Sequence, residues 1–201
     1  MQSLLNPNAT KATALHARAS DTYADKLADT QALLQRAAAA FQPLTQASSL
    51  GAEDVVITHL INALQLEATV FVLNTGALHT ETLALLERTQ AHSRAAVKVF
   101  QPDHTAVIQF VRNEGQDAMY RSIELRKACC GIRKMEPLAR ALHGQRAWIT
   151  GLRQEQSDAR ADVLLQDDSE VASKGLTKFN PLAKWTWGDV WHYIAENQVD
   201  Y

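Results

Sequence analysis

The only two cysteines of this chain, Cys129 and Cys130, are neighbours in the stretch RKACCGIRK. Adjacent α-carbons lie about 3.8 Å apart, below the usual span of a disulfide, so a bond between the two sulfurs would be strained. Basic residues on both sides favour thiolates, which bind soft metals or attack electrophiles. The pair is therefore expected to bind a metal or to react with a substrate. The alternative is a buried core cysteine with an inert neighbour.

Two cysteines supply half of the ligands that either candidate metal centre needs. An iron-sulfur cluster takes four thiolates, and structural zinc takes four donors. Of the seven histidines only His143 is near the pair, and no ligand-like spacing joins it to the cysteines. The other ligands of a cluster are therefore expected outside these 201 residues or in a second chain.

The stretch SSLGAED (48–54) places Gly51 between an expected strand end and a helix. A residue without Cβ there lets backbone N–H groups approach an anion, and the two serines can add hydroxyl donors. Glu53 and Asp54 would repel a phosphate unless they point elsewhere. A turn glycine followed by acids that satisfy the helix dipole is the alternative interpretation.

Two other strand ends also carry polar groups. LNTG (73–76) offers small groups suited to a ribose or a base edge, although Asn and Gly are also common in simple turns. ITGLRQEQSDAR (149–160) offers Arg153 and Arg160, which could clamp a phosphate or sulfate. Surface arginines paired with neighbouring acids are the alternative.

The elements that must position these motifs alternate between strand and helix. Hydrophobic periodicity predicts helices at 21–42, 51–66, 79–92, 104–115, 135–144 and 186–198, and strands at 68–76, 95–102 and 146–152. The segment 44–50 precedes a helix but is a poor strand by propensity. This order predicts an α/β fold with a mostly parallel sheet flanked by helices and with ligands at the carboxyl ends of the strands.

Composition excludes several classes of function. The chain has 20 Lys plus Arg against 22 Asp plus Glu, so no basic field indicates a nucleic-acid partner. No run of about 18 apolar residues and no apolar leader is present, so neither a membrane span nor export is expected. Two adjacent cysteines without a disulfide framework fit a reducing cytoplasm.

Taken together, the motifs resemble those of the assimilatory adenylyl-sulfate (APS) and phosphoadenylyl-sulfate (PAPS) reductases. The match runs in order from about residue 40 to 201 through SSLGAED, LNTGALHTE, AMYRSIELRKACCGIRKMEPLARAL, ITGLRQEQSDAR and FNPLAKWTWGDVWHYI. The resemblance implies a Rossmann-like fold of the adenine nucleotide alpha-hydrolase type. It divides the chain into a leading helical segment, 1–40, and a nucleotide-binding reductase domain, 41–201, without the family's C-terminal segment.

The resemblance also implies an activity, a cofactor and partners. The activity is reduction of APS to sulfite and AMP in sulfate assimilation and cysteine biosynthesis, with thioredoxin or glutaredoxin as electron donor. Cys129 and Cys130 would ligate a 4Fe-4S cluster, and Lys134, as a catalytic residue, would bridge electrostatically between cluster and phosphosulfate. Because family members without the cluster prefer the 3'-phosphorylated substrate, the cysteine pair favours APS. The implied substrate-binding residues are Ser48, Gly51, Ala52, Glu53, Asp54, Thr75, Gly76, Gly151, Arg153, Gln156 and Arg160.

The chain departs from the family pattern at several points. Asn74 stands where Asp is usual, and Ala77 where a larger residue is common. The family's later Cys-x-x-Cys and its nucleophilic cysteine are absent, so these residues are expected to bind nucleotide without turnover. A PAPS reductase, an ATP-using adenylating enzyme of the same fold, and a non-enzymatic nucleotide- or metal-binding module are the alternatives. The adenylating enzyme would need an SGGxDS-type loop, which this sequence lacks, and a homo-oligomer is left open.

Overall fold

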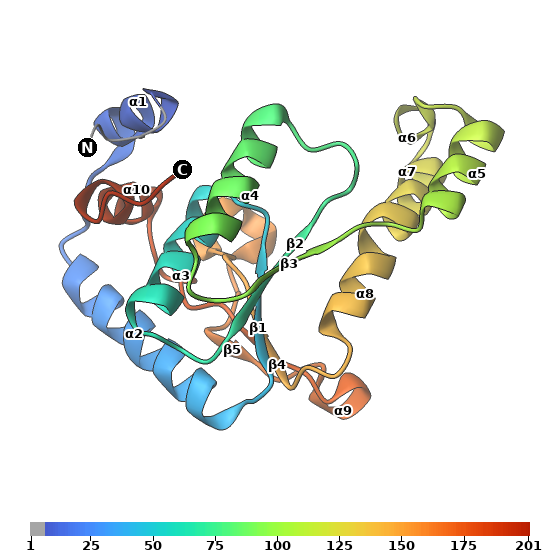
Figure 1. Cartoon of the computed structure of the whole chain (residues 1–201). Helices are drawn as coiled ribbons and strands as arrows, with labels where there is room; N and C mark the ends of the chain where they lie inside the picture. Colours follow the sequence, from blue (N-terminus) through green and yellow to red (C-terminus); the bar gives the residue numbers. More distant parts are fainter. Residues whose placement is uncertain (1–6) are drawn as a thin grey trace.

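A six-stranded sheet forms the centre of the computed structural model, which describes residues 7–201. The strand order is β3-β2-β1-β4-β6-β5 (Figure 1). All neighbours pair in parallel except β5 and β6. The strands are β1 (Leu44–Ser48), β2 (Thr69–Leu73), β3 (Val97–Phe100), β4 (Ala147–Ile149), β5 (Gln166–Asp167) and β6 (Thr177–Phe179). The predicted mostly parallel α/β fold is confirmed.

Strand β1 lies in the middle of the sheet although its sequence, LTQAS, has low strand propensity. Pairing with β2 on one side and β4 on the other satisfies its backbone. Its buried Gln46 is also satisfied, because Nε2 donates to the Asp54 carbonyl at 2.8 Å and Oε1 accepts from Thr58 Oγ1 at 2.9 Å. Tertiary hydrogen bonds therefore allow a polar segment to serve as a central strand.

The helices cover both faces of this sheet. In Figure 1, α2, α3, α4 and α10 lie on one side of the sheet and α8 lies on the other. The helices are α1 (Pro7–His16), α2 (Tyr23–Ala40), α3 (Ala52–Ala63), α4 (Thr80–His92), α5 (His104–Glu114), α6 (Ala118–Arg121), α7 (Ile123–Cys130), α8 (Glu136–Leu142), α9 (Val171–Lys174) and α10 (Trp187–Glu196). Within residues 7–201, no helix is long and apolar enough to cross a membrane.

The core includes the second helix of the predicted leading segment. Leu33 and Leu34 of α2 are buried in the same cluster as Val56 and Ile57 of α3. Residues 7–40 thus hold two helices that both pack on the rest of the chain: α2 joins the core, and α1 contacts α10, where His16 lies 6.3 Å from the ring of Trp191. Residues 1–6 of the leading segment lie outside the described residues.

The segment from α5 to the end of α7 contrasts with this core. Neither α5 nor α7 contains a buried residue, and Ala118 of α6 is fully buried. Large apolar side chains are exposed here instead, among them Ile108, Tyr120 and Ile123. Figure 1 shows α5, α6 and α7 together at one end of the molecule, away from α2 and α10.

The predicted helices and the three predicted strands are present, within a few residues of their expected ends. Thr186 is the N-cap of α10: its Oγ1 accepts from the Asp189 amide at 3.0 Å, and Asp189 Oδ2 accepts from the Thr186 amide at 2.9 Å. Helix α1 lies in the segment 1–40, which was expected to be helical, and the short elements without a periodic pattern were not predicted; these are α6, α7, α9, β5 and β6.

Candidate nucleotide-binding site

The carboxyl ends of β1 and β4 lie side by side where the chain order of the sheet reverses. Residues 49–51 connect β1 to α3, with Leu50 in the left-handed region at φ 64°. Gly51 is the N-cap of α3, with an ordinary φ of −71° and no side-chain cap. The first N–H groups of α3 are therefore free to bind an anion at the position where α/β sheets bind ligands. Leu50, and not Gly51, adopts the unusual backbone conformation.

The first N–H groups of α3 and the turn before them are called the cradle below. Neither acid of this turn presents a free carboxylate to it. Asp54 is buried, and its Oδ2 accepts from the amide and the hydroxyl of Ser49, both at 2.6 Å. Glu53 Oε1 accepts from Arg153 Nε at 2.9 Å and from Gln156 Nε2 at 3.0 Å. The expected repulsion of a phosphate is thereby reduced. The Ser49 hydroxyl, expected as a donor to the anion, donates to Asp54 instead, whereas Ser48 Oγ accepts from the Leu50 amide at 3.1 Å.

Gly151, just after β4, packs directly against the first turn of α3. A Cβ at this position would lie 2.5 Å from Asp54 Oδ1 and 2.9 Å from Glu53 Cβ. Both distances are below normal contact, and both neighbours are held by other bonds. A residue without a side chain is therefore required where the loop after β4 meets α3.

Arg153 is buried, with 4% of its surface exposed. Besides Glu53, its guanidinium binds Glu155 Oε2 through Nη1 at 2.8 Å and lies 5.4 Å from the ring centre of Trp187. Of the three guanidinium nitrogens of Arg153, only Nη2 has no hydrogen-bond partner within residues 7–201. This nitrogen is therefore the one left to bind an anion. The exposed Arg160 donates to Gln156 Oε1, which links the two predicted arginines through one amide.

A hollow of about 410 Å³ lies at the carboxyl ends of β2 and β3. Its lining includes Thr75 and Gly76, which were predicted to contact the adenosine. Gly76 has φ 76°, and its amide donates to Asn74 Oδ1 at 3.0 Å, so Asn74 supplies the acceptor that holds this turn. Arg133 Nη1 donates to the Thr75 carbonyl at 2.7 Å and joins the turn to the cysteine-bearing helix.

Cys129 and Cys130 are the last two residues of α7, and both are free thiols. Cys129 is half-buried and Cys130 is exposed, so the core interpretation does not describe Cys130. The helix continues as a π-helical turn, Gly131–Met135, in which the Glu136 amide donates to the Gly131 carbonyl. Such turns are frequent at functional sites. The wider turn also means that Cys130 and the exposed Lys134 do not have the i to i+4 relation of an α-helix.

The two thiols fit half of a four-thiolate set. They are adjacent, reachable from solvent and flanked by basic residues, as a thiolate metal site requires. Within residues 7–201 no group of three or more His, Cys, Asp and Glu side chains is placed to hold a metal. Further ligands of a cluster would have to come from elsewhere.

Several residues of this site were not among the predicted ligand-binding residues. Arg133, Glu155 and Trp187 each contact a predicted residue, either through a hydrogen bond or through the arginine–ring contact. Arg133 lies within the cysteine motif, and Glu155 within the arginine motif, so their position in the sequence was a signal. The pair of Arg153 with Glu155 was one of the alternatives for the arginine motif, whereas the contacts of Arg133 with Thr75 and of Arg153 with Trp187 could not be inferred, because these residues are distant in sequence.

Burial raises the pKa of the Asp54 carboxyl from 3.8 to about 6, despite the hydrogen bonds from Ser49 that lower it. The folded protein thus binds the proton of the Asp54 carboxyl more tightly than the unfolded chain does. The carboxyl therefore reduces stability as pH rises from about 4 to about 6, by up to about 3 kcal/mol.

Replacement of Asp54 by Asn should remove this pH dependence. We expect the free energy of unfolding of the variant, relative to the wild type, to improve by up to about 3 kcal/mol between about pH 4 and pH 7. Urea unfolding of both proteins across this range is the measurement. A difference that stays constant with pH would show that Asp54 does not titrate here.

Comparison with known proteins identifies the family of this chain. Residues 43–201 match the family model described as phosphoadenosine phosphosulfate reductase domain. An adenosine 5'-phosphosulfate reductase of Burkholderia cepacia is 45% identical over 153 residues, which are 76% of this chain and 60% of that protein. One from Allochromatium vinosum is 42% identical over 182 residues, 86% of this chain and 70% of that protein.

The fold has a solved counterpart. A phosphoadenylyl-sulfate (PAPS) reductase from Candida auris, solved as a phosphate complex, superposes with a TM-score of 0.72 at 25% identity and covers 92% of this chain and 90% of that chain. The chain spans 60% and 70% of the length of the two bacterial relatives. The family resemblance of the motifs is thereby confirmed, and the chain belongs to the phosphoadenosine phosphosulfate reductase family.

Proposed function

We propose that this chain is the nucleotide-binding part of an adenylyl-sulfate reductase, which converts adenosine 5'-phosphosulfate to sulfite and AMP. The observation that carries the proposal is the uncapped first turn of α3, packed on Gly151, with both of its acids occupied by Ser49 and Arg153. An anion can bind there without meeting a free carboxylate. The names of the bacterial relatives support APS as the substrate.

In the proposed reaction, the described residues bind the nucleotide, and a cysteine outside these residues is the nucleophile. A cysteine thiolate attacks the sulfur of APS; a sulfur–sulfur bond forms, the sulfur–oxygen bond to AMP breaks, and AMP leaves. The two thiols of thioredoxin or glutaredoxin then reduce the enzyme thiosulfonate. Sulfite is released, and the donor becomes a disulfide. The described residues bind and orient the nucleotide for this attack.

A 4Fe-4S cluster on Cys129 and Cys130 is part of the proposal. The cluster would add a fixed charge beside the substrate, and Lys134, four residues after Cys130, is the proposed cation between them. In anaerobically purified protein that includes the remaining ligands, iron and acid-labile sulfide should be present and should be lost in Cys130→Ser. Full iron content in that variant would contradict the assignment.

Solvent-reachable paired thiols that must stay reduced support a cytoplasmic location. The exposed apolar residues of α5 to α7 are suited to contact a second copy of the chain or a docked donor protein. Neither a nucleic acid nor a membrane is part of the proposal, because the charge is balanced and the described helices are short or polar.

Calorimetric titration with APS, PAPS and ATP tests the substrate. We expect APS to bind more tightly than both other nucleotides. Tighter binding of PAPS would favour the PAPS reductase alternative. Tighter binding of ATP would favour an adenylating enzyme, and no binding of any nucleotide would contradict the proposal.

A further inference from the structure

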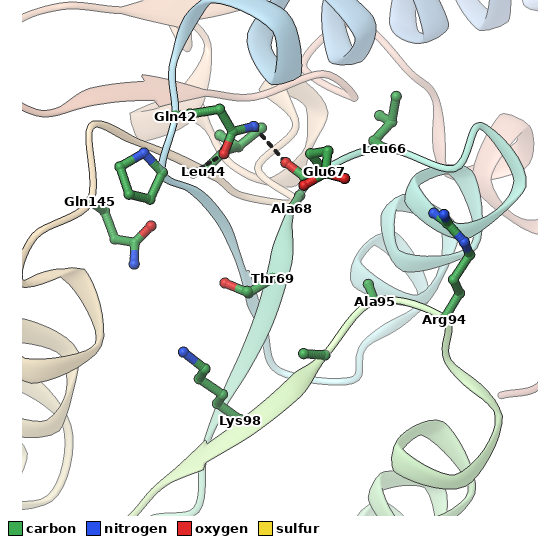
Figure 2. Close-up of a pocket in the computed structure, with 12 residues that line it drawn as sticks. Gln42, Leu44, Leu66, Glu67, Ala68, Thr69, Arg94, Ala95, Lys98 and Gln145 are labelled. Atoms are coloured by element: carbon green, nitrogen blue, oxygen red, sulfur yellow. Dashed lines mark hydrogen bonds between the residues drawn. The ribbon is translucent and has the colours of Figure 1, made fainter.

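Charged side chains at the two edges of the sheet are fixed to different degrees. Where β1, β2 and β3 begin, a depression of about 630 Å³ is lined by exposed charges, and Figure 2 shows Lys98 and Arg94 on different sides of it. At the carboxyl edge, Arg153 is buried and bonded through two of its guanidinium nitrogens. The residues that hold this guanidinium therefore decide where its free Nη2 lies.

Trp187, at the start of α10, holds Arg153 through both its ring and its backbone. The guanidinium lies over the indole, 5.4 Å from the ring centre, a distance at which a cation and an aromatic face attract each other. The Trp187 amide donates to Glu155 Oε2 at 2.7 Å, and the same oxygen accepts from Arg153 Nη1 at 2.8 Å. A shift of Trp187 would therefore displace both the ring and the carboxylate that fix the guanidinium.

Trp185 supplies a second support for Arg153, and α2 holds Trp185 in place. Arg153 Nη1 also donates to the Trp185 carbonyl at 3.3 Å. The Trp185 indole N–H donates to Thr30 Oγ1 at 3.0 Å, and its ring packs edge-on against Tyr23 with 5.6 Å between ring centres. Helix α2 thus fixes one of the groups on which the guanidinium rests.

The backbone between α1 and α2 packs directly on the first turn of α10. The Arg18 amide donates to the Gly188 carbonyl at 3.3 Å, and a Cβ at Gly188 would lie 2.3 Å from the Arg18 carbonyl oxygen. Only a residue without a side chain allows so close an approach. Because Gly188 directly follows Trp187, a displacement of this turn would move the ring that lies against Arg153.

Asp189 fixes the same turn from inside the protein. Its carboxylate is fully buried, accepts from the Ser20 amide at 2.7 Å and from the Ser20 hydroxyl at 3.1 Å, and pairs with Lys26 Nζ at 2.9 Å. It also accepts from the Thr186 amide at 2.9 Å. A buried carboxylate with this many donors and a cation is held in one position. The start of α10 is therefore bonded to residues on both sides of the α1–α2 connection.

We infer that residues 18–30 are a positioning element of the proposed anion site, although they precede residues 43–201, which match the family model. They hold Trp185 and Trp187, and these two residues hold Arg153 so that its free Nη2 keeps one position beside the first turn of α3. The inference rests on the proposed function for the identity of the anion, adenosine 5'-phosphosulfate. The chain of contacts predicts that disturbing this segment weakens binding of the charged part of the substrate and not of the adenosine.

The Nε–H signal of Arg153 in proton–nitrogen NMR spectra tests the positioning without any ligand. The bond to Glu53 slows exchange of this proton with solvent, and the Trp187 ring shifts its resonance. In Gly188→Ala, whose added Cβ would collide with Arg18, we expect the signal to move toward that of an exposed arginine and the proton to exchange faster. An unchanged Arg153 signal in the folded variant would overturn the inference.

Two further variants accompany this measurement. Gly131→Ala is the matched control, because a Cβ there would meet no other side chain within 4 Å among the described residues, so the Arg153 signal should stay unchanged. Lys26→Met removes only the cation from Asp189 and should shift the Arg153 signal in the same direction as Gly188→Ala. If Gly188→Ala does not fold, Lys26→Met decides, and an unchanged signal in it would overturn the inference.

Calorimetry with adenosine 5'-phosphosulfate and with adenosine tests the consequence for binding. We expect Gly188→Ala and Trp187→Leu to weaken binding of the phosphosulfate by about tenfold and binding of adenosine by less than about twofold, whereas Trp187→Phe, which keeps an aromatic face, should restore most of the affinity. Equal losses for both ligands would show a general structural effect and overturn the inference. A wild-type protein that binds neither ligand would contradict the proposed function, and the Arg153 signal would still decide the positioning.

Discussion

Substitution of Gly151 by alanine is expected to destabilise the protein and to abolish measurable nucleotide binding. The added Cβ would lie 2.5 Å from Asp54 Oδ1 and 2.9 Å from Glu53 Cβ, so the first turn of α3 must move away from the loop after β4. Overpacking of this kind costs about 1 to 3 kcal/mol. The shift also displaces the N–H groups of the cradle. Urea unfolding and calorimetry with adenosine 5'-phosphosulfate measure the two effects.

Gly51→Ala is the matched control, because both glycines line the cradle. A Cβ at Gly51 would lie 3.4 Å from Ser49 Oγ, and the backbone conformation there is open to any residue. The variant should therefore unfold within about 1 kcal/mol of the wild type, as expected for a glycine N-cap replaced by alanine. Equal stability of the Gly151 and Gly51 variants would show that α3 and the loop adjust without cost.

Loss of the Arg153 side chain should have an even larger effect on stability. Arg153 and Glu53 have side-chain exposures of only 5% and 13%, and the carboxylate would remain half-enclosed without its partner. Removing one member of a buried pair costs about 3 to 5 kcal/mol. We therefore expect Arg153→Ala to lower the free energy of unfolding by an amount in this range, measured with urea.

A double-mutant cycle separates the ion pair from the packing of the arginine. Glu53→Gln removes the charge that needs Arg153, so the double variant should be less destabilised than the sum of the two single variants. Additive effects would mean that Arg153 acts mainly through its contact with Trp187 and the Trp185 carbonyl. Glu155 remains in all variants, because it is exposed and also accepts from the Trp187 amide at 2.7 Å.

The order of elements was predictable because apolar periodicity is strong in α2, α3, α4 and β2. Strand β1 was a weaker prediction, since the polar Gln46 is favourable there only through its bonds to α3. Strands of two and three residues, such as β5 and β6, are too short to carry a periodic pattern. Their pairing depends on tertiary contacts that local sequence does not specify.

The motifs of the site were predictable, but the direction of their side chains was not. The sequence places Glu53 and Asp54 at the start of α3, where either could have faced a phosphate. One turns inward to Ser49, and the other pairs with Arg153, which is 100 residues away in sequence. Spacing along the chain does not decide which of several acids a guanidinium contacts. The structure confirms that these motifs lie at the carboxyl ends of β1 and β4 and corrects the hydrogen bonds expected of their acids, while their role in nucleotide binding stays a prediction.

Helices α5 and α7, which contain no buried residue, are expected to open locally before the core unfolds. Helices held by few apolar contacts unfold at lower free energy than the core does, so amide hydrogens of residues 104–130 should exchange with solvent well before those of α3. Cys129 and Cys130 lie at the end of this segment, next to the π-helical turn. The Cys130 thiol is already exposed, and the half-buried Cys129 thiol becomes fully accessible in partial openings that leave the sheet and the nucleotide cradle intact.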